Sequence, residues 1–299
     1  MRTARLFVTH TWCQEIEAEF LKLAACADAD TWLLVDSEVE NIAEIRSRYP
    51  LCHVFEKTAL LSNGLYERIP TRGLIGHGHL PILDFFLAHS TYDYYWFVEY
   101  DVRYTGDWAS FFGRFDALTH DLITSHIRRY SDEPLWPWWT TFGHPSLKWP
   151  VQRWIRSFNV IYRISRSALV FLDAILRTGW HGHHEVLVPT LMDREGFRLL
   201  DFGGDGCFAD PDAIDSVYTS ASSQSGYLNP EGTLCFRPAR ASAGDRPETL
   251  YHPVKPPAQL ETAEEREAAL QLWQQELTLD LRLVTRRQAR REPVTVTRS

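Results

Sequence analysis

The hydrophobic positions of residues 5–57 repeat with two periods, one typical of strands and the other typical of helices. Three short apolar runs predict buried strands, and the two segments between them carry apolar residues at helical spacing. The expected elements are, in chain order, strand 5–10, helix 14–25, strand 31–38, helix 41–49 and strand 52–57. This β-α-β-α-β order is typical of a nucleotide-binding sheet.

The same periods predict the elements of the central part of the chain. Helical spacing returns at 81–90, and the bulky apolar run from Tyr94 to Val98 predicts another buried strand. In the helix that begins near Glu185, we expect Pro189 at the edge of the first turn, where a missing N–H matters least. The remaining expected elements are helix 108–116, strand 121–127, strand 157–165, helix 167–179, strand 197–204 and a short element at 249–255.

These elements predict an α/β fold in which helices flank a mixed sheet, within one main domain formed by residues 1–258. In the remaining segment, 259–299, Thr262 and Glu265 form a capping box at the start of a helix, and a basic tail ends the chain. Such an amphipathic helix packs back on the domain or on a second copy, so it is the candidate element for a homodimer. Its apolar stripe comprises Leu270, Trp273, Leu277, Leu281 and Val284.

The charge and the cysteine content exclude several classes of protein. The 299-residue chain has a formal net charge of −8, which argues against binding nucleic acid through its phosphates. The five cysteines are scattered and form no C-x-x-C pair, so they predict neither a disulfide framework nor a zinc cluster. No apolar run is long enough for a signal peptide or a membrane span, and a cytoplasmic protein is therefore expected.

Two carboxylates directly follow the predicted strand at 94–98. Glu99 and Asp101 are two positions apart, so strand alternation places them on one side of the chain and Tyr100 on the other. In open α/β sheets, ligands bind in the crevice outside the carboxyl ends of the strands. Two hard oxygen ligands would therefore face one point in that crevice. The simpler alternative is a pair that caps the strand end and binds Arg103.

Three segments, YYWFVEYDVRYTGDW, HHEVLVPTLM and YHPVK, follow the β-α-β-α-β start in this order. With that start they resemble the GT-A type of nucleotide-sugar-dependent glycosyltransferase. The chain is similar to a GT-A-like group of fungal and bacterial proteins with an E-x-D-V-R-x-T-G segment, and more distantly to the mucin-branching N-acetylglucosaminyltransferases. The resemblance covers roughly residues 5–255. It implies a GT-A-like (Rossmann-like) fold, a nucleotide-sugar donor and a glycan or other hydroxyl acceptor.

The resemblance assigns the acid pair to the donor diphosphate. Glu99 and Asp101 occupy the place of the family's D-x-D motif, with glutamate in the first position. They are then the candidate ligands of a divalent cation, Mn²⁺ or Mg²⁺, that neutralises the departing diphosphate. A metal-independent variant would use cationic side chains instead, and His252 and Lys255 in YHPVK are of the right type.

The nucleoside of such a donor would lie at the ends of the first two strands. Thr9 and His10 end the first strand and Asp36 ends the second, so these residues are candidates for binding the base and the ribose. Asp36 is equally well explained as a turn residue at a strand end. The chain carries no G-x-G-x-x-G and no P-loop motif, so its phosphates must be bound in another way.

An inverting transfer also needs a base for the acceptor hydroxyl. Glu185 is the candidate, because a glutamate opens a helix in a similar way in the mucin-branching enzymes, and His183 and His184 would orient it or contact the acceptor. Asp205, in FGGDG, is the alternative base. Simpler explanations are a glutamate stabilised by the helix dipole and an aspartate in a turn.

The segment 130–154 contains five tryptophans, four prolines and no periodicity, which predicts a long loop. Aromatic faces stack on sugar rings, so Trp136, Trp138 and Trp139 are candidates for lining the acceptor site, with packing of the loop on itself as the alternative. His77 and His79 lie in another irregular segment, where we interpret them as ordinary loop histidines.

Two other functions remain open from the sequence. The first is a hydrolytic metal site in HGHHE, because two histidines and a glutamate are plausible zinc ligands, although H-E-x-x-H is absent. The second is a carbohydrate-binding or partner-binding module that does no chemistry. A glycosyltransferase is the leading hypothesis.

Overall fold

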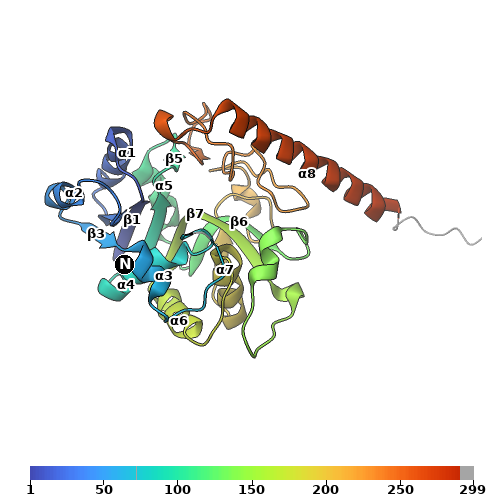
Figure 1. The fold of residues 1–299 in the computed structure, drawn as a ribbon, viewed down its shortest axis with the longest axis horizontal. Helices are drawn as coiled ribbons and strands as arrows, with labels where there is room; N and C mark the ends of the chain where they lie inside the picture. Colours follow the sequence, from blue (N-terminus) through green and yellow to red (C-terminus); the bar gives the residue numbers. More distant parts are fainter. Residues whose placement is uncertain (72, 290–299) are drawn as a thin grey trace, which may run out of the picture.

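The computed structural model describes residues 1–71 and 73–289. Its centre is a seven-stranded sheet with the strand order β3-β2-β1-β4-β7-β6-β8 (Figure 1). Strand β7 runs antiparallel to its two neighbours, and every other neighbouring pair in this sheet is parallel. The strands are β1 (Thr3–Thr9), β2 (Asp30–Asp36), β3 (Cys52–Phe55), β4 (Tyr94–Glu99), β6 (Leu122–Arg129), β7 (Ile155–Ser165) and β8 (Leu199–Asp201).

Helices cover both faces of this sheet, and a hydrophobic core fills each side. One core contains residues of α4, α6 and α7, and the other contains residues of α1, α2 and α5. The helices are α1 (Gln14–Ala24), α2 (Ile42–Arg48), α3 (Lys57–Ser62), α4 (His79–Ala88), α5 (Trp108–Asp116), α6 (Arg166–Leu176), α7 (His184–Glu195) and α8 (Ala263–Ala289). The predicted fold class, a mixed α/β sheet flanked by helices, is confirmed.

Strand β4 shows how the sequence pattern produces this arrangement. Tyr95 and Phe97 belong to the first core, whereas Trp96 and Val98 belong to the second. The alternation follows from the period of two in a strand, and the continuous apolar run follows from burial on both faces of a largely parallel sheet.

A small second sheet lies beyond the end of β4. Strand β5 (Arg103–Tyr104) pairs antiparallel with β9 (Leu250–Tyr251). This pairing joins two segments that are far apart in the sequence, and it brings the YHPVK segment next to the acid pair. The sequence patterns predicted neither β5 nor helix α3.

The structure corrects the sequence predictions at two places, in helix α7 and in the long loop at 130–154. Pro189 is the sixth residue of α7 and lies inside the helix, because the helix already begins at His184. The segment 130–154 is largely irregular, as expected, but it contains two short 3₁₀ helices, Pro137–Thr141 and Val151–Arg153. Two further 3₁₀ turns span Pro211–Ala213 and Pro257–Gln259.

Helix α8 extends away from the sheet domain (Figure 1). Its capping box is confirmed, because the Thr262 N–H donates to Glu265 Oε2 at 2.8 Å and the Glu265 N–H donates to Thr262 Oγ1 at 3.2 Å. The side chains of Leu277, Leu281 and Val284 and residues 290–299 of the basic tail lie outside the described residues, whereas the start of the predicted tail, 285–289, belongs to α8. The apolar stripe, the homodimer and the boundary at residue 258 therefore stay predictions.

Within the described residues, no helix combines the length and the apolar character needed to cross a membrane.

A buried arginine ties β1 to the turn before β2, and it allows a test of the fold. Arg5 is buried, its guanidinium lies over the Phe112 ring at 4.2 Å, and it donates to the Cys26 carbonyl at 3.0 Å and to the Asp28 carboxylate. The hydrogen bond from Arg5 is the main reason that the pKa of Asp28 is lowered, and burial opposes it. Asp28 therefore stabilises the fold above its unfolded pKa, near 4, and this contribution is lost as the pH falls through its folded pKa.

We expect Asp28→Asn to lower the free energy of unfolding by about 1 kcal/mol at pH 7, a modest value because the Asp28 side chain is 47% exposed. Urea unfolding at pH 7 and pH 3 would measure the difference from wild type, which should shrink at pH 3. The exposed Asp245→Asn provides a matched control. A loss of the same size at both pH values would contradict the role of the Asp28 charge.

Candidate functional site

The acid pair and a histidine from the small second sheet converge at the carboxyl end of β4. Glu99 Oε2 lies 3.7 Å from His252 Nε2, and Asp101 Oδ1 lies 3.3 Å from the same atom. One ligand atom from each of the three residues lies within 4.8 Å of the other two. The predicted placement of Glu99 and Asp101 on one side of the chain is thus observed.

The backbone around His252 fixes the direction of its ring. The Nδ1–H group donates to the Cys235 carbonyl at 2.8 Å, which leaves Nε2 facing the acid pair. The Val254 N–H donates to the Asp101 carbonyl at 2.8 Å and holds the two segments together. A ring held through one nitrogen, with the other directed at carboxylates, is a common arrangement for a metal-binding or proton-sharing histidine.

The charges of His252 and Asp101 stabilise each other, whereas burial and the charge of Asp101 raise the pKa of Glu99. Burial opposes the charged form of His252, but Asp101 and Glu99 together raise its pKa to about 10. Burial likewise opposes the charge of Asp101, but His252 and Lys255 hold the pKa of this carboxyl below its usual value. The Lys255 ammonium lies 3.8 Å from Asp101 Oδ2. The acid pair is therefore part of a charged network in which two cations are already present.

Asp101 has one oxygen without a hydrogen bond. The residue is 4% exposed, and its Oδ1 atom forms an ion pair with His252 Nε2 at 3.3 Å but accepts no hydrogen bond of good geometry from the described residues. Buried carboxylate oxygens are normally paired, because an unpaired one loses its hydration without compensation. An oxygen of this kind is suited to a cation or to a donor group of a ligand.

The ends of β1 and β2 lie at the same edge of the sheet. His10 packs edge-on against Tyr100, with ring centroids 5.0 Å apart, and it interacts electrostatically with Asp101, Lys255 and Asp36. Asp36 is buried, accepts the Glu38 N–H at 3.1 Å and lies 3.8 Å from Lys57 Nζ. The predicted nucleoside residues therefore share one edge with the acid pair.

The Thr9 side chain forms hydrogen bonds within the turn after β1. A residue that the sequence analysis did not predict, Gln259, links this turn to the C-terminal segment. The Thr9 hydroxyl donates to the Thr11 carbonyl and accepts the Thr11 N–H at 3.2 Å. Gln259 accepts from the Tyr100 hydroxyl at 3.0 Å and donates to Thr11 Oγ1 at 3.2 Å. Gln259 lies beyond YHPVK in a proline-rich segment, and no pattern in the sequence pointed to it.

Glu185 lies in the first turn of α7 and belongs to the same site. Burial raises its pKa to about 8, Arg156 and a backbone hydrogen bond from Asn159 oppose this rise, and the charge of Glu99 adds to it. The charges of Glu99 and Glu185 are therefore close enough to interact. Because Pro189 has no N–H group, the Glu185 carbonyl also lacks its usual helical donor four residues later.

Arg156 is a second residue that the sequence analysis missed. It is buried on β7, its guanidinium pairs with Glu133 and lies over the Trp136 ring at 5.2 Å, and its Nη2 atom has no hydrogen-bond partner among the described residues. A signal existed, because Arg156 and Asn159 are polar residues in a strand that is buried along its whole length. Polar residues at such positions require partners, which here come from the site.

Two histidines near the start of α7, His77 and His79, were expected to be ordinary loop residues. His77 and His79 are 2% and 5% exposed, and they interact electrostatically with His183 and His184. Burial lowers the pKa values of His79 and His183 to about 3, and it lowers the pKa of His184 well below its usual value. The imidazoles around Glu185 are therefore neutral at physiological pH. His77 lies in the loop before α4, as expected, whereas His79 is the first residue of α4, and neither belongs to a group of metal-ligand atoms among the described residues.

Two of the three predicted acceptor tryptophans are part of the core. Trp136 and Trp139 are 6% and 3% exposed, which contradicts an acceptor role because neither presents a face to a sugar. The backbone of Gly226 lies against Trp136 so closely that an added Cβ atom would be 2.5 Å from its side chain. Trp138 is half-buried and stacks on His183, with ring centroids 4.8 Å apart. It is the one of the three that remains a candidate.

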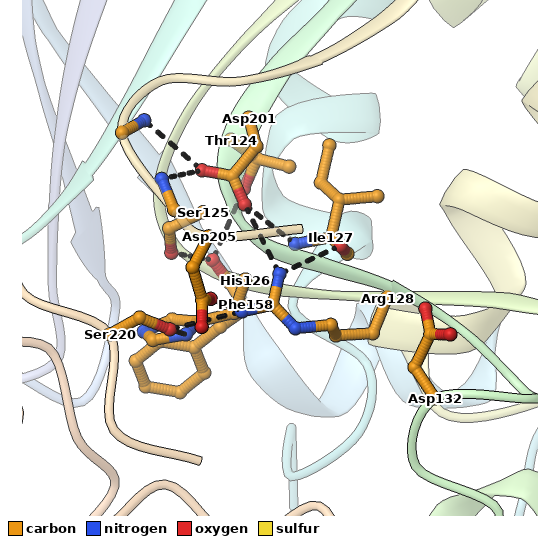
Figure 2. A network of polar contacts seen from close by, with 12 residues as sticks. Thr124, Ser125, His126, Ile127, Arg128, Asp132, Phe158, Asp201, Asp205 and Ser220 are labelled. Atoms are coloured by element: carbon orange, nitrogen blue, oxygen red, sulfur yellow. Dashed lines mark hydrogen bonds and ion pairs between the residues drawn. The ribbon is translucent and has the colours of Figure 1, made fainter. Parts of the chain in front are cut away.

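Asp205 is not supported as an alternative base. Its exposed carboxylate pairs with Arg128, which also binds the Ser220 hydroxyl, and Figure 2 shows the three residues together. Behind them, the buried Asp201 accepts hydrogen bonds from the Ile127 N–H, the Gly204 N–H and the Tyr218 hydroxyl (Figure 2 shows the first of these contacts). This network fixes the turn after β8. Because the Asp205 carboxylate is already paired with Arg128, we interpret Asp205 as a turn residue and not as a base.

Comparisons with known proteins give a family likeness and weak structural similarity. The profile of a family described as "Protein of unknown function (DUF3405)" matches residues 22–122, which is less than half of the chain. No curated protein matches the sequence. Three solved structures are similar at low scores, and likenesses at this level do not indicate an activity.

The first of these structures is assigned as a glucose-1-phosphate thymidylyltransferase from Bacillus anthracis in complex with a sucrose. It has 9% identity and a TM-score of 0.39, with 67% of this chain and 85% of that chain covered. The inositol-1-phosphate CTP transferase from T. maritima has 9% identity and a TM-score of 0.38, with 72% and 92% covered. A mycobacterial protein has 16% identity and a TM-score of 0.39, with 67% and 65% covered.

Proposed function

We propose that this protein is a glycosyltransferase that moves a sugar from a nucleotide-sugar donor to a hydroxyl acceptor. The observation that carries the proposal is the convergence of Glu99, Asp101 and His252 at the carboxyl edge of the sheet, with Glu185 in electrostatic contact with the same cluster. A cation-binding cluster and a separate buried carboxylate match the two tasks of an inverting transfer, which are neutralisation of the leaving diphosphate and deprotonation of the acceptor.

The donor diphosphate would lie against Glu99, Asp101 and His252. Glu99 and Asp101 fit a divalent cation such as Mn²⁺ or Mg²⁺, because two carboxylates at one point are suitable ligands, and His252 joins them as a ligand only in its neutral form. When bound, the cation would supply Lewis acidity to the leaving diphosphate. Lys255 adds a positive charge beside it, and Asp36, Thr9 and His10 would bind the nucleoside.

The same cluster also suits a metal-independent variant. His252 carries a positive charge over the physiological pH range, and Lys255 lies beside it. These two cations would then neutralise the phosphate oxygens directly, as electrostatic clamps do in other phosphate sites. The two versions differ in their need for a metal, and this difference is measurable.

Glu185 would act as the base. As the acceptor oxygen forms its bond to the anomeric carbon of the sugar, the bond from that carbon to the diphosphate oxygen breaks, and the acceptor proton passes to the Glu185 carboxylate. The displacement inverts the configuration at the anomeric carbon. Trp138 and His183, stacked on each other next to Glu185, would contact the acceptor.

A thermal shift experiment tests this function without knowledge of the sugar. We expect one nucleoside diphosphate, in a panel of uridine, guanosine, cytidine, adenosine and thymidine diphosphates, to raise the midpoint of unfolding of the full chain, because a ligand of the native state stabilises it by mass action. Adding Mn²⁺ should increase the rise if the acid pair binds metal. The absence of a shift with every nucleotide, with and without Mn²⁺, would contradict the proposed function.

A further inference from the structure

A second group of metal-ligand atoms lies at the start of α7. His183 Nδ1 is 3.6 Å from Glu185 Oε2, and His184 Nε2 is 3.8 Å from Glu185 Oε1. One ligand atom from each of the three residues lies within 4.8 Å of the other two. None of the three side chains pairs directly with a lysine or arginine in the described residues, and the charge of Arg156 offsets that of Glu185 only in part.

We propose that His183, His184 and Glu185 bind a divalent cation of the imidazole-preferring class, represented by Zn²⁺. Zinc binds nitrogen at about 2.0–2.1 Å and carboxylate oxygen at about 2.0–2.2 Å in a tetrahedral arrangement, so its ligand atoms lie about 3.4 Å apart. The separations of 3.6 and 3.8 Å are to the two different oxygens of Glu185, and one ligand atom from each residue lies within 4.8 Å of the other two, so side-chain shifts of about an ångström would bring a single set to this value. Three protein ligands leave the fourth position open to water or to a substrate oxygen.

The surroundings of the two histidines hold them in place for this purpose. The His183 ring stacks on Trp138, its Nδ1 atom accepts the Glu185 backbone N–H at 3.4 Å, and the backbone N–H of His183 donates to Thr141 Oγ1 at 2.9 Å. The His184 ring lies against Gly78, where an added Cβ atom would be 2.4 Å from it, and the His184 N–H donates to the Gly76 carbonyl at 2.8 Å. Rings positioned by packing and backbone contacts lose little freedom when they bind a metal. Burial also keeps them neutral, which is the form that binds metals.

This site differs in ligand chemistry from the cluster at the end of β4. Two imidazoles and one carboxylate favour Zn²⁺, Cu²⁺ or Ni²⁺, whereas the two carboxylates at Glu99 and Asp101 favour Mg²⁺ or Mn²⁺. The H-E-x-x-H motif of zinc proteases spreads its ligands over one helical turn. Here they are adjacent in sequence and come from the helix cap and the first turn, an arrangement that a motif search does not find.

The consequence for activity rests on the proposed function. Because Glu185 is the proposed base, a Zn²⁺ ion bound to its carboxylate would prevent it from accepting the acceptor proton. The imidazole-preferring cation is therefore an inhibitor of transfer, while Mn²⁺ at the acid pair supports it. The existence of the site itself does not depend on the reaction.

Cobalt(II) serves as a spectroscopic substitute for Zn²⁺ in the test. The full chain, purified with its affinity tag removed and treated with a chelator, is titrated with Co²⁺ at pH 7.5 while the visible absorption of tetrahedral Co²⁺ is recorded. We expect the tetrahedral absorption to reach a plateau that corresponds to one Co²⁺ ion per chain, and added Zn²⁺ to abolish it. We expect His183→Asn and Glu185→Gln each to weaken Co²⁺ binding at least tenfold, because each removes one of three ligands.

Two controls separate this site from other metal binding. Asp101→Asn should leave the Co²⁺ spectrum unchanged, and His144→Asn, which alters a histidine outside the cluster, should do the same. The unfolding midpoint of each metal-free variant shows whether it is folded, and His184→Asn replaces any variant that is not. The proposal is overturned if wild type binds no stoichiometric tetrahedral Co²⁺, or if the ligand variants bind it as tightly as wild type. Nucleotide binding is measured separately, so a failure here leaves the proposed function untouched.

Discussion

Replacing Asp101 with asparagine is expected to weaken Mn²⁺-dependent binding of the nucleoside diphosphate by about one hundredfold. The change removes a full negative charge from the point where Glu99 and His252 converge, and it places an amide group near Lys255, which is 3.8 Å from the wild-type carboxylate. Interactions with charged partners contribute about 1.5–3 kcal/mol each, which corresponds to roughly ten- to a hundredfold in affinity. Isothermal titration of wild type and variant with the nucleotide selected by the thermal shift panel measures the effect.

The sign of this effect also distinguishes the two versions of the donor site. If the diphosphate binds through a metal, the loss of a ligand weakens binding. If it binds directly to His252 and Lys255, the Asp101 charge repels the phosphates, and removing it should not weaken binding in the absence of metal. Asp205→Asn is the matched control, because Asp205 pairs with Arg128 in the turn after β8. Equal losses in the two aspartate variants would remove Asp101 from the donor site.

Much of the fold could be predicted because the apolar residues of its strands and helices repeat with a clear period. The apolar run of β4 alternates between two cores, so its position and the common direction of Glu99 and Asp101 followed from a period of two. Strand β5 has only two residues and exists because it pairs with β9. Such an element has no local pattern, and its pairing joins segments separated by more than a hundred residues.

Site residues could be predicted where neighbouring residues in the sequence identify them. They were missed where the packing of distant segments brings the residues together. The cluster of His77, His79, His183 and His184 depends on the packing of the segment before α4 against the cap of α7, which no spacing in the sequence reveals. The tryptophans were misjudged for the same reason. A tryptophan-rich loop looks like a binding surface in sequence, but Trp136 is covered by the approach of the Gly226 backbone.

Glu185→Gln is expected to lower the rate of transfer by a factor of about 10²–10⁴, while affinity for the donor changes less than twofold. Glutamine has nearly the same shape and cannot accept the acceptor proton. The neutral amide also avoids burying a charge, so the variant should fold as well as wild type. Hydrolysis of the donor, in which water takes the place of the acceptor, is measured in chelator-treated protein with added Mn²⁺, so the acceptor need not be known.

The matched control for Glu185→Gln is Glu195→Gln, an exposed glutamate at the other end of α7 that makes no contribution to the site. It should retain the wild-type rate. If donor binding is lost together with the rate in Glu185→Gln, Glu185 belongs to the donor site and the base is another group. If the rate is retained, no proton passes to Glu185. A loss of rate with intact donor binding is the result that a base on the acceptor side requires, because the acceptor proton is transferred only in the transition state of the chemical step.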